Sequence, residues 1–337
     1  MKIEENKSLK QYNTFGIDVS ARYFVTLSDL CDFDELKSLQ LDRHRGLFVL
    51  GGGSNIVFTK DYDGVVLHPE NSEIKATDGL DGDVHVEAGA GMKWVDFVRL
   101  CVQNEWHGVE NMAYIPGTVG AAPVQNVGAY GVEAKDVISA VNYLDIETGE
   151  HRSLDAEQCR FAYRDSVFKH ALKGKCIVTS VVFKLNKNYT PVLTYKALVQ
   201  CLAERGIDKP TACQTVEAVT ALRKAKLPEV DVTGSAGSFF KNPVVSNDIF
   251  ERLLERHPDI VSFPVDGGRK IAAGWLIERA GWKGKTVGNV GVYEKQALVL
   301  VNRGGCSGRE VMGLANAIID DIDGKFGIRL EPEAIIM

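Results

Sequence analysis

The stretch IPGTVGAAPVQNVGAYG, residues 115–131, carries the most information about the fold of this chain. It contains four glycines and two prolines, which interrupt both helical and strand periodicity. Its remaining residues are mostly small or apolar, with few charges, which is unlike a flexible linker. The stretch therefore predicts an ordered loop that wraps closely around a large, flat ligand whose middle is uncharged.

A second glycine-rich stretch, LGGGSNIVF at residues 50–58, follows a predicted strand. Glycines reach positive φ, so that successive N–H groups can face one anion. A lone glycine triplet is most often a turn, but two such loops in one α/β half favour a phosphorylated cofactor. The standard nucleotide motifs fit poorly, because neither GGGSNI nor GAGMKW has the third glycine of the Rossmann fingerprint. AGWKGKT at 280–286 is no P-loop either, because Arg279 stands where that motif needs glycine.

Composition narrows the class of protein. The 337 residues, 45% of them hydrophobic, are enough for about two domains. A net charge of −6 without a basic patch argues against a nucleic-acid partner. The first ten residues lack a signal-peptide core, and no apolar run approaches the roughly 18 residues of a membrane helix. Seven cysteines without a CxxC pair predict free thiols in a reducing cytoplasm, and isolated histidines argue against a metal enzyme.

The hydrophobic periodicity predicts an α+β chain. Strands are expected at 21–27, 47–50 (buried), 84–91, 137–146, 176–185, 297–302 (buried) and 328–336. Helices are expected at 28–39 with Ser28 as the N-cap, and at 93–104, 214–226, 248–257, 272–281 and 309–327. The segment 110–131 shows little periodicity. The change in pattern places a boundary between two α+β halves near 190–212.

Six motifs in this order resemble one family, the UDP-N-acetylenolpyruvoylglucosamine reductases of bacterial peptidoglycan synthesis. They are NTFGI (13–17), GGGSN (51–55), the 115–131 stretch, CRFAYRDSVFK (159–169), SFFKNP (238–243) and LEPE (330–333). The resemblance runs from about residue 10 to the C-terminus. It implies an FAD-binding fold of the vanillyl-alcohol oxidase type followed by an α+β substrate-binding domain. The expected segments are an FAD-binding region of two α+β subdomains (1–190), a substrate lid loop and linker (191–212), a substrate-binding domain (213–325) and a C-terminal catalytic strand (326–337).

The resemblance also implies the reaction. FAD is bound without a covalent link, in keeping with the absence of histidine and cysteine from both glycine loops. NADPH gives a hydride to FAD and leaves, and the enolpyruvyl ether of UDP-N-acetylglucosamine then takes the hydride at its vinyl carbon C3. The product is UDP-N-acetylmuramate. The expected partners are these small molecules, with no nucleic acid, membrane or obligate protein partner.

Hydride addition to an enol ether beside a carboxylate produces an enolate. Such a reaction needs positive or hydrogen-bonding groups at the developing charge and a proton donor at C2. The resemblance assigns proton donation to Ser238, enolate stabilisation to Arg164 and a catalytic carboxylate to Glu333. Without it, Ser238 is better explained as part of a turn. Arg164 could be a surface ion pair with the neighbouring aspartate, a pair worth at most about 1 kcal/mol.

Two assignments remain open from the residues alone. Glu331 and Glu333 point to the same face of a strand, and only motif position favours Glu333. Arg223 and Lys226 share a helix face that could meet phosphates, or could simply be solvated, as Lys224 between them suggests.

The resemblance completes the list of binding residues. FAD is assigned to Gly51, Gly52, Gly53, Ser54 and Asn55, and to Gly117, Thr118, Gly120, Gln125, Asn126 and Gly128. Substrate contacts are assigned to Tyr130, Tyr163, Tyr195, Arg223, Lys226, Asn242 and Gln296, with Tyr195 covering the UDP part and Asn242 the expected polar neighbour of Ser238.

Two other functions are weighed. A flavin oxidase of the same fold would show rapid reoxidation of its reduced flavin by air. A nucleotide-binding protein without redox chemistry would be colourless and could not be reconstituted with FAD.

Overall fold

The computed structural model describes residues 1–28 and 46–337, so nearly all of the helix expected at 28–39 lies outside the described residues. The described chain forms two compact units, which are considered separately. Unit 1 comprises Met1–Lys7, Ala21–Gly52 and Asp63–Lys224, and unit 2 comprises Ser8–Ser20, Gly53–Tyr62 and Ala225–Met337. Both units are discontinuous in sequence, so they divide the chain differently from the four consecutive segments expected above.

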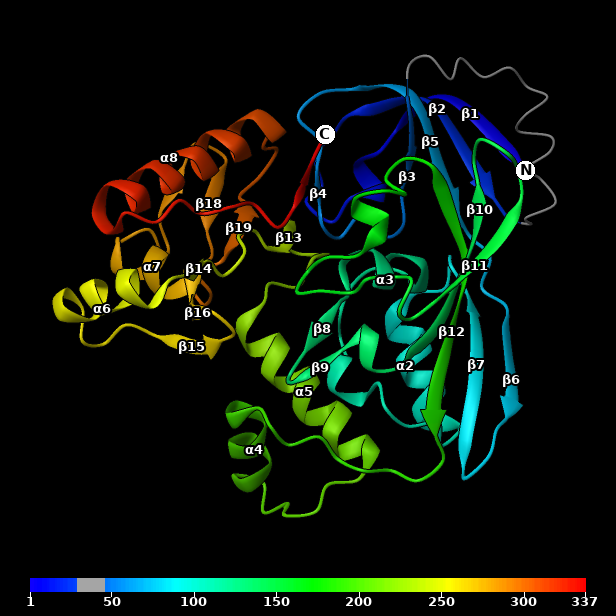
Figure 1. The fold of residues 1–337 in the computed structure, drawn as a ribbon. Helices are drawn as coiled ribbons and strands as arrows, with labels where there is room; N and C mark the ends of the chain where they lie inside the picture. The colour runs from blue at the N-terminus through cyan, green and yellow to red at the C-terminus, as the bar shows by residue number, and fades with distance from the viewer. Residues whose placement is uncertain (29–45) are drawn as a thin grey trace. The chain divides into compact units, whose positions relative to one another are not determined.

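Unit 1 is built on two main sheets, which Figure 1 shows in blue to green. The first has the order β1-β2-β5-β3, with β3 parallel to β5: Lys2–Ser8, Ser20–Leu27, Tyr62–Pro69 and Leu47–Val49. The second is antiparallel, with the order β11-β10-β12-β7-β6: His151–Asp155, Ile138–Asp145, Cys176–Asn186, Asp83–Gly89 and Ile74–Asp78. The expected buried strand at 47–50 is therefore a short edge strand, β3, whose three residues are only partly buried.

The main core of unit 1 lies between its second sheet and helix α2 (Trp94–Gln103). Apolar residues at positions 94, 97, 98 and 101 give α2 one continuous buried stripe. The rings of Trp94 and Phe97 lie 5.9 and 4.4 Å from the ring of Phe183 on β12. The unit also contains α4 (Lys196–Ala203) and most of α5 (Ala212–Lys226), whose last two residues belong to unit 2.

The segment 110–136 is ordered but contains no long element, as its glycines and prolines predict. It forms only short turns and bridges: η3 (Glu110–Met112), η4 (Val119–Ala121), α3 (Ala122–Gln125), β8 (Gly128–Ala129), β9 (Val132–Glu133) and η5 (Ala134–Asp136). Helix α3 ends after one turn, because Asn126 adopts a left-handed conformation with φ +44°.

Unit 2 has three small sheets and three helices. The first sheet is antiparallel, with the order β13-β19-β18-β17: Ser235–Ser238, Val299–Asn302, Val290–Val292 and Thr286–Val287. The second has the order β14-β16-β15: Val244–Val245, Gly268–Ile271 and Ser262–Val265. The third pairs β20 (Ile335–Ile336) with β4 (Ile56–Val57) in parallel. The helices are α6 (Asn247–Arg256), α7 (Ala273–Arg279) and α8 (Gly308–Phe326).

Local sequence explains the bounds of α8, the long red helix of Figure 1. Ser307 accepts a hydrogen bond from the backbone N–H of Glu310, whose carboxylate in turn accepts from the backbone N–H of Ser307. This capping box satisfies two N–H groups at the helix start. The helix ends at Gly327, which has φ +66°.

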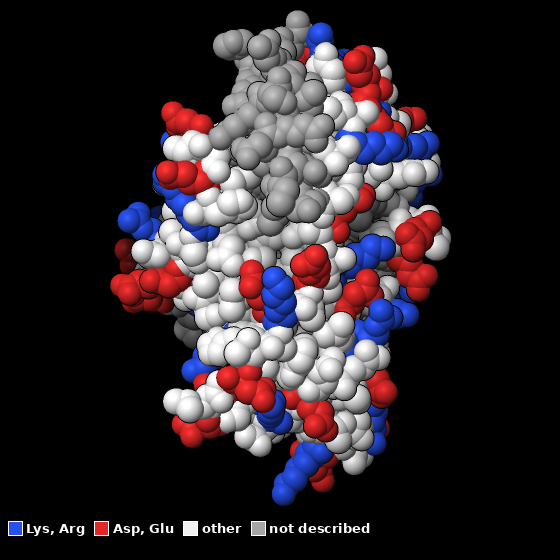
Figure 2. All heavy atoms as spheres, turned by 90° about the vertical axis from the view of Figure 1, so that its right-hand side faces the viewer, with Lys and Arg blue, Asp and Glu red and all other residues white. Residues whose placement is uncertain are grey.

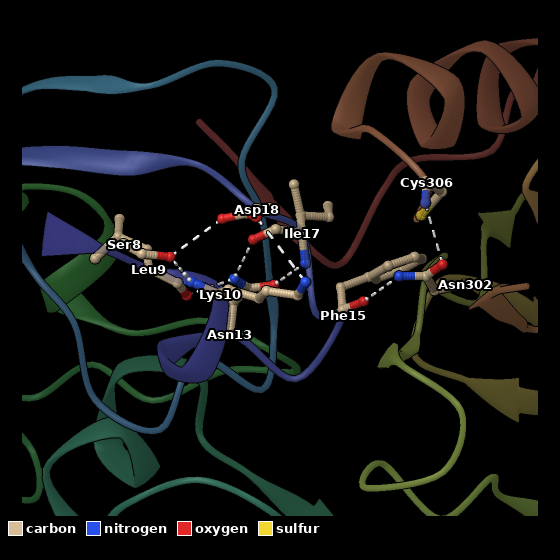
Figure 3. A network of polar contacts seen from close by, with 9 residues as sticks. All are labelled: Ser8, Leu9, Lys10, Asn13, Phe15, Ile17, Asp18, Asn302 and Cys306. Atoms are coloured by element: carbon tan, nitrogen blue, oxygen red, sulfur yellow. Dashed lines mark hydrogen bonds and ion pairs between the residues drawn. The ribbon is translucent and has the colours of Figure 1, made fainter. Parts of the chain in front are cut away.

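The NTFGI motif forms a loop in unit 2, and Figure 3 shows its polar network. The Asn13 side chain closes the loop by donating to the carbonyls of Leu9 (2.7 Å) and Ile17 (3.0 Å) and accepting from the Ile17 N–H (2.9 Å). Asn302 at the end of β19 donates to the carbonyl of Phe15 at 2.9 Å. These bonds attach the loop to the sheet that carries Ser238.

Most of the expected elements are confirmed within two or three residues, but the strand expected at 328–336 is wrong over most of its length. Only Ile335–Ile336 forms a strand, β20. The preceding residues touch the SFFKNP segment through a single bridge, Phe240 with Pro332. The pairing does not extend further, because the Phe239 N–H donates to the Leu298 carbonyl at 2.8 Å instead of to this segment.

On the face of the molecule that Figure 2 shows, the charges of the described residues are mixed. The face in Figure 2 carries positive and negative side chains interspersed, with no continuous area of one sign among its described residues. In residues 1–28 and 46–337, no helix is long and apolar enough to cross a membrane. The same residues contain no cluster of three potential metal ligands, and the six described cysteines are free.

Candidate functional site

The two glycine-rich loops meet within unit 1. A Cβ atom at Gly52 would lie 2.8 Å from Gly117 Cα, and one at Gly51 would lie 2.6 Å from Thr118 Oγ1. Both distances are too short for a side chain, so the loops can approach this closely only because glycines stand there. Gly120 packs equally closely on Ala90, and its N–H donates to the Ala90 carbonyl at 2.9 Å. The result is a cradle of backbone and small side chains, which fits a flat cofactor that carries phosphates.

The rest of the first loop belongs to unit 2. Gly53 has φ +59°, and any side chain there would collide with the Tyr12 carbonyl. Ser54 follows and is partly buried. The Asn55 side chain donates to the Glu333 carbonyl at 3.2 Å, and the Asn55 carbonyl accepts from the Ile335 N–H at 2.9 Å. The end of the predicted cofactor loop therefore positions the segment that carries Glu333.

Asn126 has a structural role that its sequence position did not reveal. Its side chain is fully buried, donates to Glu133 Oε2 (2.9 Å) and the Ala162 carbonyl (3.0 Å), and accepts from the Lys135 N–H (2.9 Å). These bonds engage the amide within the protein, so any contact of Asn126 with a cofactor would come from its backbone. The neighbouring Gln125 is partly buried at the end of α3.

Arg164 lies in a tight turn between Ala162 and Asp165, whose backbone groups bond to each other at 3.0 and 3.2 Å. Its φ of +54° is rare for a residue with a side chain. The guanidinium donates to the Gly128 carbonyl at 3.2 Å and lies 5.4 Å from the ring centre of Tyr163. The FAYRDS turn is thereby attached to the second glycine loop, which aims Arg164.

The neighbouring Asp165 pairs with His170, whose Nε2 lies 2.7 Å from Oδ2. Burial tends to raise the pKa of Asp165, but the hydrogen bonds from His170 and from the Ser166 N–H outweigh it, and the pKa is lowered. The carboxylate beside Arg164 therefore already has a partner of its own.

Arg223 on α5 is a largely buried cation. Its Nε donates to the carbonyl of Tyr114 at 2.9 Å, and no carboxylate pairs with it among the residues the structure describes. Burial lowers the pKa of Arg223, the nearby Tyr130 raises it, and the positive charge of Arg164 lowers it. Burial in turn raises the pKa of Tyr130. A buried charge without a counter-ion is costly, so this place favours binding of an anion.

The two tyrosines expected at the substrate lie together in unit 1. The ring centres of Tyr130 and Tyr195 are 5.0 Å apart, edge to face at 73°. Tyr195, just before α4, is 45% exposed and therefore accessible to a ligand. Tyr163 is also exposed, and so is Lys226, the last residue of α5.

Ser238 ends β13 in unit 2 at a β-bulge. The pairing with β19 shifts between Ser235 and Ser238, and Gly237 in between has φ +68°. A bulge of this kind re-aims the next side chain. The Ser238 hydroxyl is partly exposed and has no hydrogen-bond partner among the described residues. Phe239 and Phe240 after it are fully buried with their rings 5.1 Å apart, so they anchor the segment as expected.

The structure separates the two glutamates that the sequence left open. The Glu333 N–H donates to the Phe239 carbonyl at 2.7 Å, and the Lys241 N–H donates to the Glu331 carbonyl at 2.9 Å. The Glu331 side chain is 75% exposed and lies 3.5 Å from Lys241 Nζ, which makes it a surface ion pair. Glu333 is partly buried, two residues along the same segment.

Two amide side chains flank the first turn of α7. Asn242 Oδ1 accepts from the Ala273 N–H at 2.9 Å, and Gln296 Oε1 accepts from the Leu298 N–H at 3.2 Å. Gln296 Oε1 also lies close to Gly274, since a Cβ there would be 3.1 Å away. The NH₂ groups of both amides have no partner in the described part of the chain. They can therefore donate to a ligand.

Three residues near the site were missed from the sequence. The Thr14 carbonyl accepts from the Ser235 N–H at 3.0 Å, and the Thr14 hydroxyl donates to the Ser235 carbonyl at 2.6 Å. The Thr14 N–H donates to the Gly53 carbonyl. Tyr114 has φ +58°, and Lys224 Nζ lies 5.4 Å from the centre of the Tyr114 ring. Asn111 bridges two backbone segments. Thr14 could have been found from its motif, whereas the other two carry no local signal.

Comparisons with known proteins agree with this description. Residues 21–155 match a family model described as an FAD binding domain. Residues 228–337 match the C-terminal domain of UDP-N-acetylenolpyruvoylglucosamine reductase. A curated UDP-N-acetylenolpyruvoylglucosamine reductase of Burkholderia ambifaria is 46% identical, covering 97% of this chain and 95% of its own. One from Burkholderia pseudomallei is 47% identical, covering 98% of this chain and 96% of its own.

A solved structure supports the fold. The UDP-N-acetylenolpyruvylglucosamine reductase of Thermus caldophilus is 24% identical and superposes with a TM-score of 0.68, covering 100% of this chain and 99% of its own. The expected α+β architecture with an FAD-binding domain is thereby confirmed.

Proposed function

The chain belongs to the family of UDP-N-acetylenolpyruvoylglucosamine reductases, and from this premise we propose how its residues divide the work of the reaction. It is an FAD-dependent oxidoreductase that reduces the enolpyruvyl ether of UDP-N-acetylglucosamine to UDP-N-acetylmuramate with NADPH. The product is a precursor of peptidoglycan.

The backbone cradle of the two glycine loops holds the cofactor. Gly51, Gly52, Gly117 and Thr118 contribute close backbone approach and N–H donors, with Gly53, Ser54, Asn55, Gly120, Gln125, Asn126 and Gly128 on the same loops. Bound there, FAD supplies hydride transfer between NADPH and the substrate.

The positive groups of unit 1 handle the substrate's negative charge. Arg164 presents a planar fork that suits a carboxylate and stabilises the enolate as its charge develops. Arg223, partly buried and without a carboxylate partner among the described residues, attracts a second anionic group such as the pyrophosphate. Tyr130, Tyr163 and Tyr195 surround the nucleotide sugar. Lys226, the last residue of α5 and already part of unit 2, adds a further positive charge.

Unit 2 supplies the proton. The Ser238 hydroxyl donates to C2 of the enolate, which is basic enough to take a proton from an alcohol when the geometry is right. Glu333, whose N–H bonds to the residue after Ser238, provides the carboxyl group through which the proton is replenished. The free NH₂ groups of Asn242 and Gln296 orient the substrate.

The observation that carries this assignment is the bulge at Gly237. It turns a partly exposed hydroxyl without a hydrogen-bond partner among the described residues out of a strand that is otherwise anchored by two buried phenylalanines. Its neighbour Phe239 is bonded directly to the segment that carries Glu333. A hydroxyl without a partner among the described residues, on a segment bonded to the one that carries Glu333, suits a proton donor better than a structural serine.

One absorbance trace on purified, FAD-loaded protein without oxygen tests the function. NADPH should bleach the yellow band, and the UDP-linked enolpyruvyl sugar should restore it. A band that stays bleached would contradict the substrate, and rapid reoxidation by air alone would favour the flavin oxidase. We place the reaction in the cytoplasm, where NADPH and nucleotide sugars are made, with no protein partner required.

A further inference from the structure

We propose that Asn111 is a positioning residue that sets the geometry of the Tyr130–Tyr195 pair and thereby the affinity for the nucleotide-sugar substrate. The inference rests on the substrate role proposed for Tyr195. All the residues that carry it lie in unit 1.

Asn111 joins two segments that are distant in sequence. It lies in η3 and is 3% exposed. Its Nδ2 donates to the Tyr130 carbonyl at 2.8 Å and to the Val192 carbonyl at 2.9 Å. Both amide protons are therefore used, one on the second glycine loop and one on the segment that leads to Tyr195.

The two carbonyls control the two tyrosines. Tyr130 has φ +50°, a strained conformation that persists only where its surroundings enforce it. Val192 precedes Tyr195 by three residues, and between them Thr194 packs so closely on Gly131 that a side chain at Gly131 would collide with its hydroxyl. Loss of the Asn111 bonds would therefore change the distance and angle of the ring pair.

A separate anchor holds the start of the same segment. The Tyr189 hydroxyl bonds to Thr215 Oγ1 on α5 at 2.6 Å, and its ring lies 5.1 Å from that of His107. His107 is itself paired with the buried Glu110 at 2.8 Å. Because this anchor does not involve Asn111, the segment should stay attached at Tyr189 when Asn111 is changed, and the effect should be confined to the part that carries Tyr195.

The residue type matches the task. Aspartate has nearly the same shape as asparagine, but its carboxylate cannot donate and would face two carbonyl oxygens. Serine can donate one hydrogen bond. Asn111→Asp and Asn111→Ser thus form a graded pair, and Tyr189→Phe, which removes only the bond to Thr215, is the matched control at the other anchor.

The test measures three quantities on the FAD-loaded protein: the Kd of UDP-N-acetylglucosamine by calorimetry, KM and kcat for the enolpyruvyl substrate, and the melting temperature. We expect Asn111→Asp to raise Kd and KM by about tenfold with kcat changed less than about threefold. The Kd and KM of Asn111→Ser should lie between those of Asn111→Asp and the unchanged protein. Asn111→Ser replaces Asn111→Asp in the test if the aspartate variant does not fold. Tyr189→Phe should change Kd less than about twofold.

A double-mutant cycle with Tyr195→Ala decides whether Asn111 acts through that ring. If it does, Asn111→Asp should change Kd by less than about twofold once Tyr195 is alanine. Effects that multiply in the double variant would overturn the proposal for Asn111 and leave Tyr195 in its role. An unchanged Kd in Tyr195→Ala alone would instead refute the substrate role of Tyr195, and with it the present inference.

Discussion

The functional residues of the two units are aimed by different means. In unit 1, Tyr114, Tyr130 and Arg164 all carry positive φ despite their large side chains. In unit 2, the positive φ near the site falls on Gly237, and Ser238 and Glu333 lie on extended segments joined by backbone hydrogen bonds. Strain in a residue with a side chain costs about 1–3 kcal/mol, while glycine avoids that cost. Unit 1 therefore holds its site by tertiary packing and unit 2 by strand pairing.

Their electrostatics differ as well. Unit 1 holds the partly buried cation of Arg223 without a carboxylate partner among the described residues. The ion pairs of unit 2, such as Lys241–Glu331 and Arg303–Glu294, lie at the surface. A cation without a carboxylate partner suits the anion binding that we propose for unit 1. The proton donation that we propose for unit 2 needs no such cation.

Ser238→Ala should remove the proton donor of unit 2 and give the largest loss of activity. Removing a general acid should slow substrate-dependent reoxidation of the flavin by about 10²–10⁴-fold, while NADPH-dependent reduction changes little. Stopped-flow absorbance measures both half-reactions separately. Ser246→Ala, which removes only the N-cap of α6, is the control. Equal loss in both half-reactions would mean that Ser238 is structural.

Arg164→Lys tests the aimed side chain of unit 1. A point charge replaces a planar fork, so the second half-reaction should slow by about 10²-fold. Arg160→Lys is a matched control, because Arg160 is also an arginine at positive φ but is exposed. Near-normal turnover of Arg164→Lys would support the view that Arg164 is an ordinary surface residue.

Gly52→Ala tests the cradle on which both proposals depend. The added methyl would meet the backbone of Gly117, and overpacking of this kind costs about 1–3 kcal/mol. If that cost falls on cofactor binding, FAD affinity should drop by about 30-fold, measured by the flavin fluorescence released on dilution. Gly313→Ala on α8, where a Cβ meets nothing within 4 Å, should retain FAD. Unchanged FAD affinity in Gly52→Ala would show that the cofactor does not use this loop.

Arg223→Met tests the electrostatic difference between the units and should give the smallest loss of activity of the four variants. Replacing a partly buried cation that has no carboxylate partner among the described residues with an apolar side chain should leave the melting temperature equal or higher. The KM for the UDP-linked substrate should nevertheless rise by about tenfold, because an anion partner is lost. A lower melting temperature with an unchanged KM would show that Arg223 stabilises the fold instead of binding substrate.

Much of the fold, and the irregular course of the two glycine loops, could be predicted from the sequence. The glycines at 51–53 and 117–120 indicate close backbone approach wherever they stand, and apolar spacing locates α2, α5 and α8 within a few residues. The strand at 328–336 was the exception, since its residues pair with SFFKNP only at the Phe240–Pro332 bridge and the Phe239 N–H is bonded to the Leu298 carbonyl instead. Ladder pairing depends on a partner strand, which periodicity does not reveal.

The roles of individual polar side chains were decided by the tertiary structure. Asn126 and Asn111 look alike in sequence, yet one is engaged with Glu133 and Ala162 and the other bridges Tyr130 and Val192. Glu331 and Glu333 became distinguishable only when Lys241 was placed beside the first. The sequence by itself determined where the backbone turns and which faces are apolar, because conformational preference and burial are largely local properties. Which donor meets which acceptor depends on segments brought together from far along the chain, and only the folded structure decides that.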